Sequence, residues 1–331
     1  MTAPTTTSPT RTVPHRGATT VLALGVPAVL TAVTVLVALG WRDRLPDPVA
    51  SHWGPDGVDG SSSLVGLLLP LVGMNLAFAL GLWAIGFFWG YAAMTRRFAV
   101  GVAVWTSTFV DGLLVAMLAA QLDVPAAAQA RDLGGWLALA IAGALVVGAL
   151  AAWASPGDAR LAATGQVPDA APRLPLPETE QASWVQHLRA GRPVWIGVAV
   201  VAFAAVMTLV TRSWWFGLAL VATLLPLLVA VTEWTVSVDR RGLVARSRLP
   251  RPRVMVPLEE VEEAVVVHVN PLREFGGWGI RTGVGGRVGV IMRGGEAIEV
   301  VRTGGRRVVV TVDDAATGAA LLNTLAARTR A

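Results

Sequence analysis

The sequence predicts an α-helical integral membrane bundle of about six transmembrane helices, followed by a small β-barrel or β-sandwich domain that ends in a helix. The first observation is charge, because only 15% of the 331 residues are charged, whereas ordinary soluble domains carry about 25%. Residues 1–232 hold 23 of the 49 charged residues, and the last 99 residues hold the other 26. The second observation is a series of long apolar runs in the first part, and the third is a period-two alternation in the last part.

Two residue types are missing from the chain, and their absence excludes several kinds of chemistry. There is no Cys, which excludes disulfides, thiolate nucleophiles and cysteine-ligated clusters. There is no Lys, so all 27 basic residues are Arg. A Walker-A phosphate-binding lysine and a Schiff-base lysine are therefore excluded, because Arg cannot supply a neutral amine.

The apolar runs predict the membrane spans in order. Residues 1–18, rich in Thr, Pro and Arg, are predicted to be a disordered tail. The run 19–40 is long enough to cross a bilayer, for which about 20 residues are needed. A cleaved signal peptide is the alternative, but its apolar segment is usually about 7–15 residues long. The further predicted spans are 64–90, 99–121, 136–154, 194–211 and 213–232.

These spans define a four-helix membrane part at 19–154 and a tight transmembrane hairpin at 194–232. The hairpin turns around Arg212, with Trp195, Trp214 and Trp215 as interface anchors. Small residues recur every four positions on two of the spans and are expected to allow close helix packing, by contacts within the chain or between copies of it. They are Gly73, Ala77 and Gly81 on one span, and Ala144, Gly148 and Ala152 on the other.

The charges of the loops predict the orientation. The tail and the loop 91–98 contain Arg but no acidic residue, whereas the loop 41–63 holds four Asp and two Arg. The positive-inside rule then places both termini in the cytoplasm and the loop 41–63 on the extracytoplasmic side of a plasma membrane. The Pro-rich segment 155–193 is predicted to be a cytoplasmic linker. Within it, residues 178–190 are predicted to form a short helix, either in the headgroup layer or in a fluctuating linker.

Residues 233–331 are predicted to form a cytoplasmic domain of about seven short strands and one helix. Trp234, Val236 and Val238 alternate with polar residues, which is typical of a strand. Gly304-Gly305 predicts a two-residue hairpin turn, and Asp313 is expected to cap a helix that runs to about Arg328. The further predicted strands are 243–248, 253–256, 261–269, 288–293, 297–303 and 306–312.

The segment Leu45–Gly57, with the sequence LPDPVASHWGPDG, resembles the domain-of-unknown-function 1648 family. This family includes membrane proteins related to sporulation-delay toxin immunity proteins. The resemblance is carried by Pro46, His52, Trp53 and Gly57. It implies an integral membrane protein that, in some relatives, has a toxin-immunity or signalling role, and it does not imply an enzyme.

The C-terminal part is similar to bacterial pleckstrin-homology-like domains. The similarity rests on the number of predicted strands, on the terminal helix and on the run FGGWGIR at 275–281. It implies a domain that, in many relatives, binds protein or lipid.

Three interpretations of the loop 41–63 follow from its residues. His52 with Asp47, Asp56 and Asp59 offers ligand atoms for a divalent metal, although the spacing matches no recognised site. Alternatively, His52 and Trp53 pack at the interface, and Gly54, Gly57 and Gly60 allow positive φ in a compact turn. In the third interpretation, the loop binds a cationic or amphipathic extracytoplasmic peptide or protein.

Asp111 is predicted to lie near the middle of its span, where a carboxylate is energetically costly and often functional. Asn75 lies at a similar depth on an adjacent antiparallel span, so the two side chains are expected to meet. Thr31, Thr34 and Thr208 also lie at similar depth. One interpretation is a neutral Asp111 that is hydrogen-bonded to Asn75 or Ser107 and holds the helices together. The other is a site that couples to the movement of an ion or proton.

Six arginines lie within 14 residues just after the last predicted span, and they are expected to dock on an anionic lipid surface or to form a solvated basic face. They are Arg240, Arg241, Arg246, Arg248, Arg251 and Arg253. Nucleic acid is not expected as a partner, because no aromatic residues interleave with this cluster. The Gly-rich run 283–289 departs from a dinucleotide-binding fingerprint and is predicted to be a hairpin turn.

The sequence thus predicts a non-enzymatic membrane protein without a cofactor or a metal, acting as a sensor, an interaction protein or an immunity-type accessory protein. Its partners would be the bilayer, an anionic lipid surface and a molecule that binds the loop 41–63. The alternative is a small transporter that uses Asp111 and Asn75. A membrane enzyme ranks third, because no nucleophile–base pair is visible.

Overall fold

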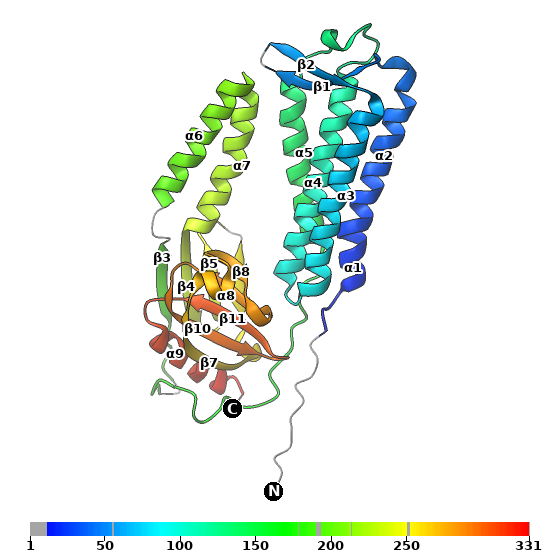
Figure 1. Ribbon diagram of the computed structural model, residues 1–331. Coiled ribbons are helices and arrows are strands. Elements are labelled where there is room, and N and C mark those ends of the chain that lie inside the picture. Colours follow the sequence, from blue (N-terminus) through cyan, green and yellow to red (C-terminus); the bar gives the residue numbers. More distant parts are fainter. Residues whose placement is uncertain are drawn as a thin grey trace. The chain divides into compact units, whose positions relative to one another are not determined.

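The computed structural model describes residues 12–54, 56–177, 179–189, 193–212, 214–249 and 252–330 (Figure 1). The chain divides after Asp158 into two compact units. The first unit is helical and carries a small hairpin, and the described part of the second combines α-helices with two β-sheets.

The first unit contains four helices that are long and apolar enough to cross a membrane. The first runs from Arg16 to Gly40 as α1 (Arg16–Thr20), a π-helical turn η1 (Val21–Gly25) and α2 (Val26–Gly40). The others are α3 (Leu64–Trp89), α4 (Ala93–Ala119) and α5 (Gly134–Ala154). These ranges confirm the four helices predicted between residues 19 and 154, and they indicate a membrane protein.

Helices α4 and α5 pack closely because small residues face each other. A Cβ atom added at Gly148 would lie 2.7 Å from the Cβ of Trp105 and 2.8 Å from the carbonyl oxygen of Gly101. Ala144, one turn away on α5, is fully buried. The small-residue face of α5 therefore packs within the chain, whereas Gly73 and Gly81 on α3 face open space.

The end of the first unit is tied to the start of α4 by Arg96, whose side chain is fully buried. Its guanidinium donates to the carbonyl oxygen of Gly90 at 2.7 Å and pairs with the carboxylate of Asp158 at 2.9 Å. The same carboxylate accepts a hydrogen bond from the backbone N–H of Ala93. A buried guanidinium needs such partners, because an unpaired buried charge is strongly destabilising.

At the opposite end of the bundle, the predicted loop 41–63 folds into an antiparallel β-hairpin (Figure 1). A short 3₁₀ turn η2 (Arg42–Arg44) leads into β1 (Val49–Gly54), which pairs with β2 (Gly57–Ser62). Ser63 caps α3 immediately afterwards, with its side chain accepting from the N–H of Gly66. A second 3₁₀ turn, η3 (Ala127–Gln129), lies between α4 and α5 and contacts this hairpin.

In the second unit, two apolar helices are inserted between two paired strands. Strand β3 (Trp184–Arg189) precedes α6 (Pro193–Thr211), and α7 (Trp214–Thr232) leads directly into β4 (Glu233–Asp239). Strands β3 and β4 pair antiparallel, from Trp184 opposite Val238 to Arg189 opposite Glu233. The helix predicted at 178–190 is therefore wrong, because its second half forms an edge strand.

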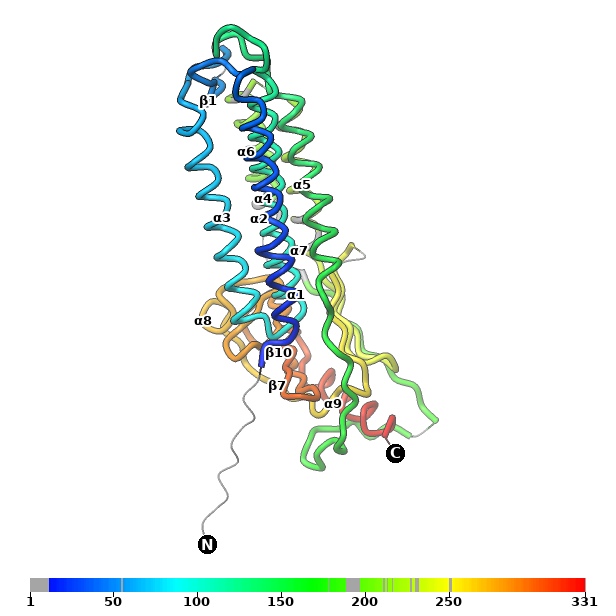
Figure 2. The backbone as a smooth tube through the Cα atoms, turned by 90° about the vertical axis from the view of Figure 1, so that its right-hand side faces the viewer, coloured from blue at the N-terminus to red at the C-terminus, as the bar shows by residue number. Residues whose placement is uncertain are grey.

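The two sheets of the second unit share the C-terminal helix. One has the order β3-β4-β5-β6 and the other β7-β10-β11-β9-β8. Helix α9 (Ala315–Arg328) contacts strands of both sheets, and Figure 2 shows it running beside β7 and β10. The remaining elements are β5 (Gly242–Ser247), β6 (Arg253–Val256), η4 (Leu258–Glu260), β7 (Val261–Val269), α8 (Pro271–Phe275), β8 (Gly279–Thr282), η5 (Val284–Gly286), β9 (Val288–Ile291), β10 (Gly295–Arg302) and β11 (Arg306–Thr311). This confirms a sheet-rich domain with a terminal helix, in which the described strands form two separate sheets.

The predicted turns and the predicted cap of this domain are found close to the expected positions, but two of the three differ in detail. Glycines join β10 to β11, but the loop has three residues, Thr303 to Gly305, rather than two. The run 283–289 connects the antiparallel strands β8 and β9, as expected for a hairpin turn. The cap of α9 is Asp314 rather than Asp313, and its side chain accepts from the N–H of Thr317.

The segment 159–183 is packed against the second unit rather than forming a free linker. Val167 and Ala171 are buried. The backbone N–H of Leu174 donates to the hydroxyl of Thr324 at 2.9 Å. The amide of Asn323, which is fully buried, donates to the carbonyl oxygen of Pro172 at 3.0 Å. The predicted linker thus belongs to the fold of the sheet domain from residue 159 onward.

Candidate functional sites

The β1–β2 hairpin is fixed to the helical bundle by the side chain of Gln121, which lies just after α4 and is fully buried. Its carboxamide oxygen accepts from the backbone N–H of Ala50 at 2.6 Å. Its amide nitrogen donates to the carbonyl oxygens of Ala50 and Met117, both at 3.1 Å. The Gln121 side chain therefore pairs with β1 as a neighbouring strand would, and it satisfies backbone groups that would otherwise be buried without partners.

Apolar packing and an ion pair complete this attachment. Val49 is buried in a cluster with residues of α2, α3 and α4, and Trp53 packs against it. The guanidinium of Arg44 lies 2.5 Å and 3.0 Å from the two carboxylate oxygens of Asp123. These hydrogen bonds lower the pKa of Asp123, so this carboxylate stays ionised and holds the entry to β1 beside the end of α4.

The four residues that carry the family resemblance occupy different environments on this hairpin. Pro46 is buried, and Trp53 is half-buried with its indole N–H donating to the carbonyl oxygen of Arg131 at 3.1 Å. His52 is exposed, and its Nδ1 lies 2.5 Å from Oδ1 of Asp59. Gly57 is exposed at the turn with a φ of 115°. Pro46 and Trp53 thus lie on the buried side of the hairpin, whereas His52 and Gly57 are exposed.

Positive φ is confined to one of the three glycines for which it was expected in this loop. Gly57, the first residue of β2, has it, and glycine adopts this backbone conformation without the steric cost of a side chain. Gly60 is needed for space instead, since a Cβ there would lie 2.9 Å from the Cβ of His52. Over the described ranges, no group of three or more His, Asp or Glu side chains is arranged to hold a metal ion.

A second candidate site is a buried polar cluster that joins α2, α3 and α4. The hydroxyl of Thr31 donates to Oδ2 of Asp111 at 3.1 Å. The amide of Asn75 donates to Thr31 at 2.9 Å and to Oδ1 of Asp111 at 3.4 Å. The hydroxyl of Ser107 donates to the carboxamide oxygen of Asn75 at 3.0 Å. The predicted contact between Asn75 and Asp111 is present, and Thr31 completes it from a third helix.

All four side chains of this buried polar cluster are at least nine-tenths buried, and Asp111 is 6% exposed. Each carboxylate oxygen of Asp111 receives one hydrogen bond from the cluster, and the Asn75 side chain uses both of its polar atoms. Thr34 is also buried but lies outside the hydrogen-bonded cluster of the described residues, and Thr208 belongs to the second unit. The arrangement can lock three helices together, and the oxygens around Asp111 are also the ligand type that suits a small cation.

The arginine cluster that follows α7 is divided into two groups by the β4–β5 hairpin. Arg240 and Arg241 lie at the turn, and Arg241 pairs with Asp239 at 2.7 Å. Arg246 and Arg248 lie on or just after the end of β5 that pairs with the start of β4. Arg253 begins β6, and Arg251 lies outside the described residues. The five described side chains therefore fall into two groups at opposite ends of the β4–β5 hairpin.

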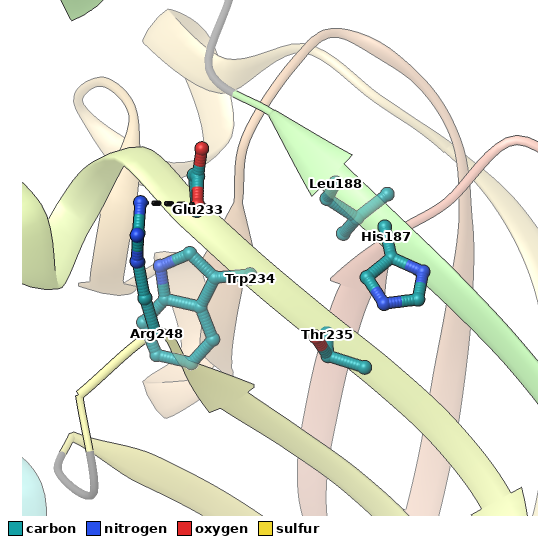
Figure 3. A pocket seen from close by; sticks show the side chains of 6 residues that line it. All are labelled: His187, Leu188, Glu233, Trp234, Thr235 and Arg248. Atoms are coloured by element: carbon teal, nitrogen blue, oxygen red, sulfur yellow. Dashed lines mark hydrogen bonds and ion pairs between the residues drawn. The ribbon is translucent and has the colours of Figure 1, made fainter.

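A depression of about 370 Å³ lies at the end of the four-stranded sheet where β4 begins (Figure 3). Arg248 pairs with Glu233 across its mouth at 3.3 Å. Trp234 is buried beneath, and its indole N–H has no hydrogen-bond partner within the described part of the chain. The lining residues are His187, Leu188, Glu233, Trp234, Thr235 and Arg248.

The residues Gln121, Thr31 and Asn323, which hold these elements in place, carry no motif in the sequence. Comparisons with protein-family models, with curated proteins and with solved structures find no match to this chain. Any function must therefore be inferred from the geometry of the three sites.

Proposed function

We propose that this chain is a non-enzymatic multi-pass protein of the plasma membrane that recognises an extracytoplasmic partner through the β1–β2 hairpin. In this proposal the second unit lies in the cytoplasm and reports or anchors that interaction. The resemblance to the domain-of-unknown-function 1648 family supports an immunity-type or signalling role. The observation that carries the proposal is a hairpin that is rigidly docked on one side and polar and exposed on the other.

The proposal includes six spans, with α6 and α7 as the last two. Each has 19 residues, which as a helix extend about 28 Å and match a hydrocarbon core of about 30 Å. Their exposed side chains are mainly apolar, including Val201, Phe203 and Leu209 on α6 and Leu218 on α7. Because such an apolar surface is unfavourable in water, it supports insertion into lipid.

Loop charges support the proposed orientation. Arg96 and Arg97 lie at the end of the bundle opposite the hairpin, and 15 of the 27 arginines follow α7. The segment around the hairpin holds four Asp and two Arg, of which Arg44 is neutralised by Asp123. The positive-inside rule therefore favours a cytoplasmic sheet domain and an outward hairpin.

The exposed side of the hairpin indicates the chemistry of its partner. Asp56 and Asp59 are exposed near the turn, and Asp47 is exposed before β1. An acidic surface attracts cations, and a hairpin that is already held by Gln121 loses little conformational entropy on binding. A cationic or amphipathic peptide segment is therefore the proposed partner.

A photo-crosslinking residue at the exposed position Ser61, activated in intact cells, tests this recognition role. We expect a defined adduct with a basic or amphipathic species, reduced in the Asp56→Asn/Asp59→Asn variant because the attracting charges are gone. The matched control places the same crosslinker at Ala162, an exposed position of the second unit. No adduct at position 61, or one that is insensitive to these charges, would contradict the proposal.

The buried polar cluster favours a second candidate function, a small transporter that uses Asp111 and Asn75. An intramembrane carboxylate surrounded by Thr31, Asn75 and Ser107 is the observation behind it. Two variants discriminate between the candidates. Loss of a cellular phenotype in Trp53→Ala but not in Asp111→Asn supports recognition by the hairpin, and the reverse supports transport.

A further inference from the structure

The outer face of the four-stranded sheet carries one row of polar side chains that runs across all four strands. Strand pairing places His187 on β3 opposite Thr235 on β4, Thr235 opposite Arg246 on β5, and Arg246 opposite Arg253 on β6. We call these four residues the arginine row. Their neighbours along the strands, such as Trp234 and Ala245, point to the buried face.

Two like charges stand directly opposite each other in this row. Side chains opposite each other in an antiparallel pair have Cβ atoms about 4.5–5.5 Å apart, and like charges there are destabilising. Arg246 and Arg253 are both exposed, and neither pairs with an acidic side chain among the described residues. By contrast, Arg241 pairs with Asp239, and Arg248 pairs with Glu233. The Arg246–Arg253 pair is therefore a concentrated positive charge that an anion would stabilise.

The distance of the arginine row from the end of α7 indicates which kind of anion could bind there. Thr235 is the third residue after the last residue of α7, Thr232, which is a distance of about 10 Å along a strand. The polar headgroup layer of a bilayer is about 5–8 Å thick on each side of the hydrocarbon core. If α7 spans the membrane, the Arg side chains of this row reach the phosphates of the adjoining leaflet.

Arg240 and Arg241 lie much farther from the end of α7. Arg240 is the eighth residue after Thr232 and follows β4, which corresponds to about 25 Å along a strand. The Debye length at physiological ionic strength is about 8 Å. These two charges are therefore screened from the lipid surface, although all six arginines follow the same span.

We propose that Arg246 and Arg253 form a binding site for the phosphate of an anionic phospholipid headgroup, with Thr235 and His187 as neighbouring hydrogen-bonding groups. The depression lined by His187, Thr235 and Arg248 adjoins this row and provides room for the rest of the headgroup (Figure 3). Arg guanidinium groups bind phosphate through paired N–H donors, which gives the site geometric as well as electrostatic preference. This inference rests on the membrane insertion of α6 and α7 that is part of the proposed function.

Lipid retention by the full chain in nanodiscs that contain phosphatidylglycerol and phosphatidylcholine tests this site. The variant Arg246→Gln/Arg253→Gln is compared with Arg240→Gln/Arg241→Gln, which removes the same number of charges from the same four-stranded sheet. Each charge near the lipid surface contributes about 1 kcal/mol to lipid binding. Because the first variant loses two such charges, the amount of phosphatidylglycerol that it retains should fall about thirtyfold. The second should retain it as the natural chain does.

The unfolding temperature of each variant shows whether a loss of lipid is caused by a loss of folding. Removal of two opposed like charges should leave the unfolding temperature of Arg246→Gln/Arg253→Gln unchanged or raised. Equal phosphatidylglycerol loss in both variants, or no loss in either, would overturn the proposal. Unchanged lipid retention with loss of a bound acidic protein in Arg246→Gln/Arg253→Gln would also overturn it, because the anion would then belong to a protein.

A separate measurement distinguishes failure of this site from failure of the membrane insertion on which it rests. A spin label at Val206→Cys, an exposed position of α6, reports its depth in the bilayer. A label in contact with lipid, together with unaffected phosphatidylglycerol binding, would reject the headgroup site alone. A label in water would reject the insertion of α6 and α7 and the headgroup site with it.

Discussion

At the scale of single residues, the buried polar cluster shows how one carboxylate organises three helices. Asp111 receives hydrogen bonds from Thr31 on α2 and Asn75 on α3, and Asn75 is oriented in turn by Ser107. Each of the three helices thus contributes a side chain that is hydrogen-bonded to a side chain of another helix. The cluster is therefore a point where loss of one side chain leaves several others without partners, which costs more than the loss of a single hydrogen bond.

Substitution of Asn75 should reveal this dependence. We expect Asn75→Ala to lower the free energy of unfolding in detergent by about 1–2 kcal/mol, because Ser107 and Asp111 both lose a partner. The measurement is a denaturation midpoint of the purified protein. Thr34→Ala is the matched control, since Thr34 is buried on α2 one turn from Thr31 but outside the cluster. Equal losses in the two variants would argue against a cooperative network.

The contact between Asn75 and Asp111 could be predicted because depth in a membrane can be counted along a helix. Ser107 was the alternative to Asn75 as the predicted partner of Asp111, but its hydroxyl donates to Asn75 instead. The choice depends on the rotation of α4 about its axis, which is set by its packing against α5 at Gly101 and Gly148. Sequence spacing alone does not fix that rotation.

At the scale of elements, the side chain of Gln121 supplies three of the hydrogen bonds that attach the β1–β2 hairpin to the bundle. Gln121→Ala removes three hydrogen bonds to backbone groups and leaves the N–H and C=O of Ala50 buried without those partners. We expect faster hydrogen exchange at the amides of β1 and a loss of about 1–3 kcal/mol of stability. Gln129→Ala, at an exposed position between α4 and α5, should leave the exchange unchanged. Unaltered exchange in Gln121→Ala would contradict this assignment.

Helix α9 provides a prediction that depends on pH. Hydrogen bonds from Thr317, through its side chain and its backbone, lower the pKa of Asp314 from the usual 3.8. Because the folded pKa lies below the unfolded one, the ionised cap stabilises the folded chain above pH 4, and this contribution is lost as the pH falls through the folded pKa. Asp314→Asn should be less stable than the natural chain near neutral pH, with a difference that shrinks as the medium becomes acidic.

The measurement for Asp314 is thermal unfolding of both proteins between neutral and strongly acidic pH. Asp313→Asn is the control, because the neighbouring Asp313 does not cap the helix. A stability difference for Asp314→Asn that stays constant with pH would show that ionisation of the cap contributes nothing.

Strand β3 shows why part of the sheet could not be predicted. Trp184 and Leu188 point to the buried face, but Gln186 stands between them and hides the alternation of apolar residues. Its side chain accepts from the backbone N–H of Asp313 at 2.8 Å, so a polar residue is satisfied at that position. The partner strand β4 also lies beyond both α6 and α7 in the chain. Trp184 and Leu188 are four residues apart, so their spacing fits one face of a helix equally well.

At the scale of the whole molecule, the chain consists of two units that divide after Asp158, so α6 and α7 belong to the same unit as the sheets, whereas the sequence predicted a separate sheet domain from residue 233. Composition predicted the helical part and the sheet-rich part because charge density and hydrophobic period differ sharply between them. It did not predict that residues 159–183 belong to the second unit, since many of their hydrogen bonds to that unit use backbone groups, which carry no sequence signal. The carbonyl groups of Leu176 and Pro177 accept from Arg328, for example.

The proposed function depends on the hairpin and the second unit facing opposite sides of the membrane. Because the natural chain contains no Cys, single cysteines at exposed positions, Ser61→Cys on β2 and Ala162→Cys in the second unit, report this directly. A membrane-impermeant maleimide applied to intact cells should label position 61, and it should label position 162 only after the membrane is permeabilised. Labelling of both positions in intact cells, or of neither, would contradict an outward recognition hairpin joined to a cytoplasmic sheet domain.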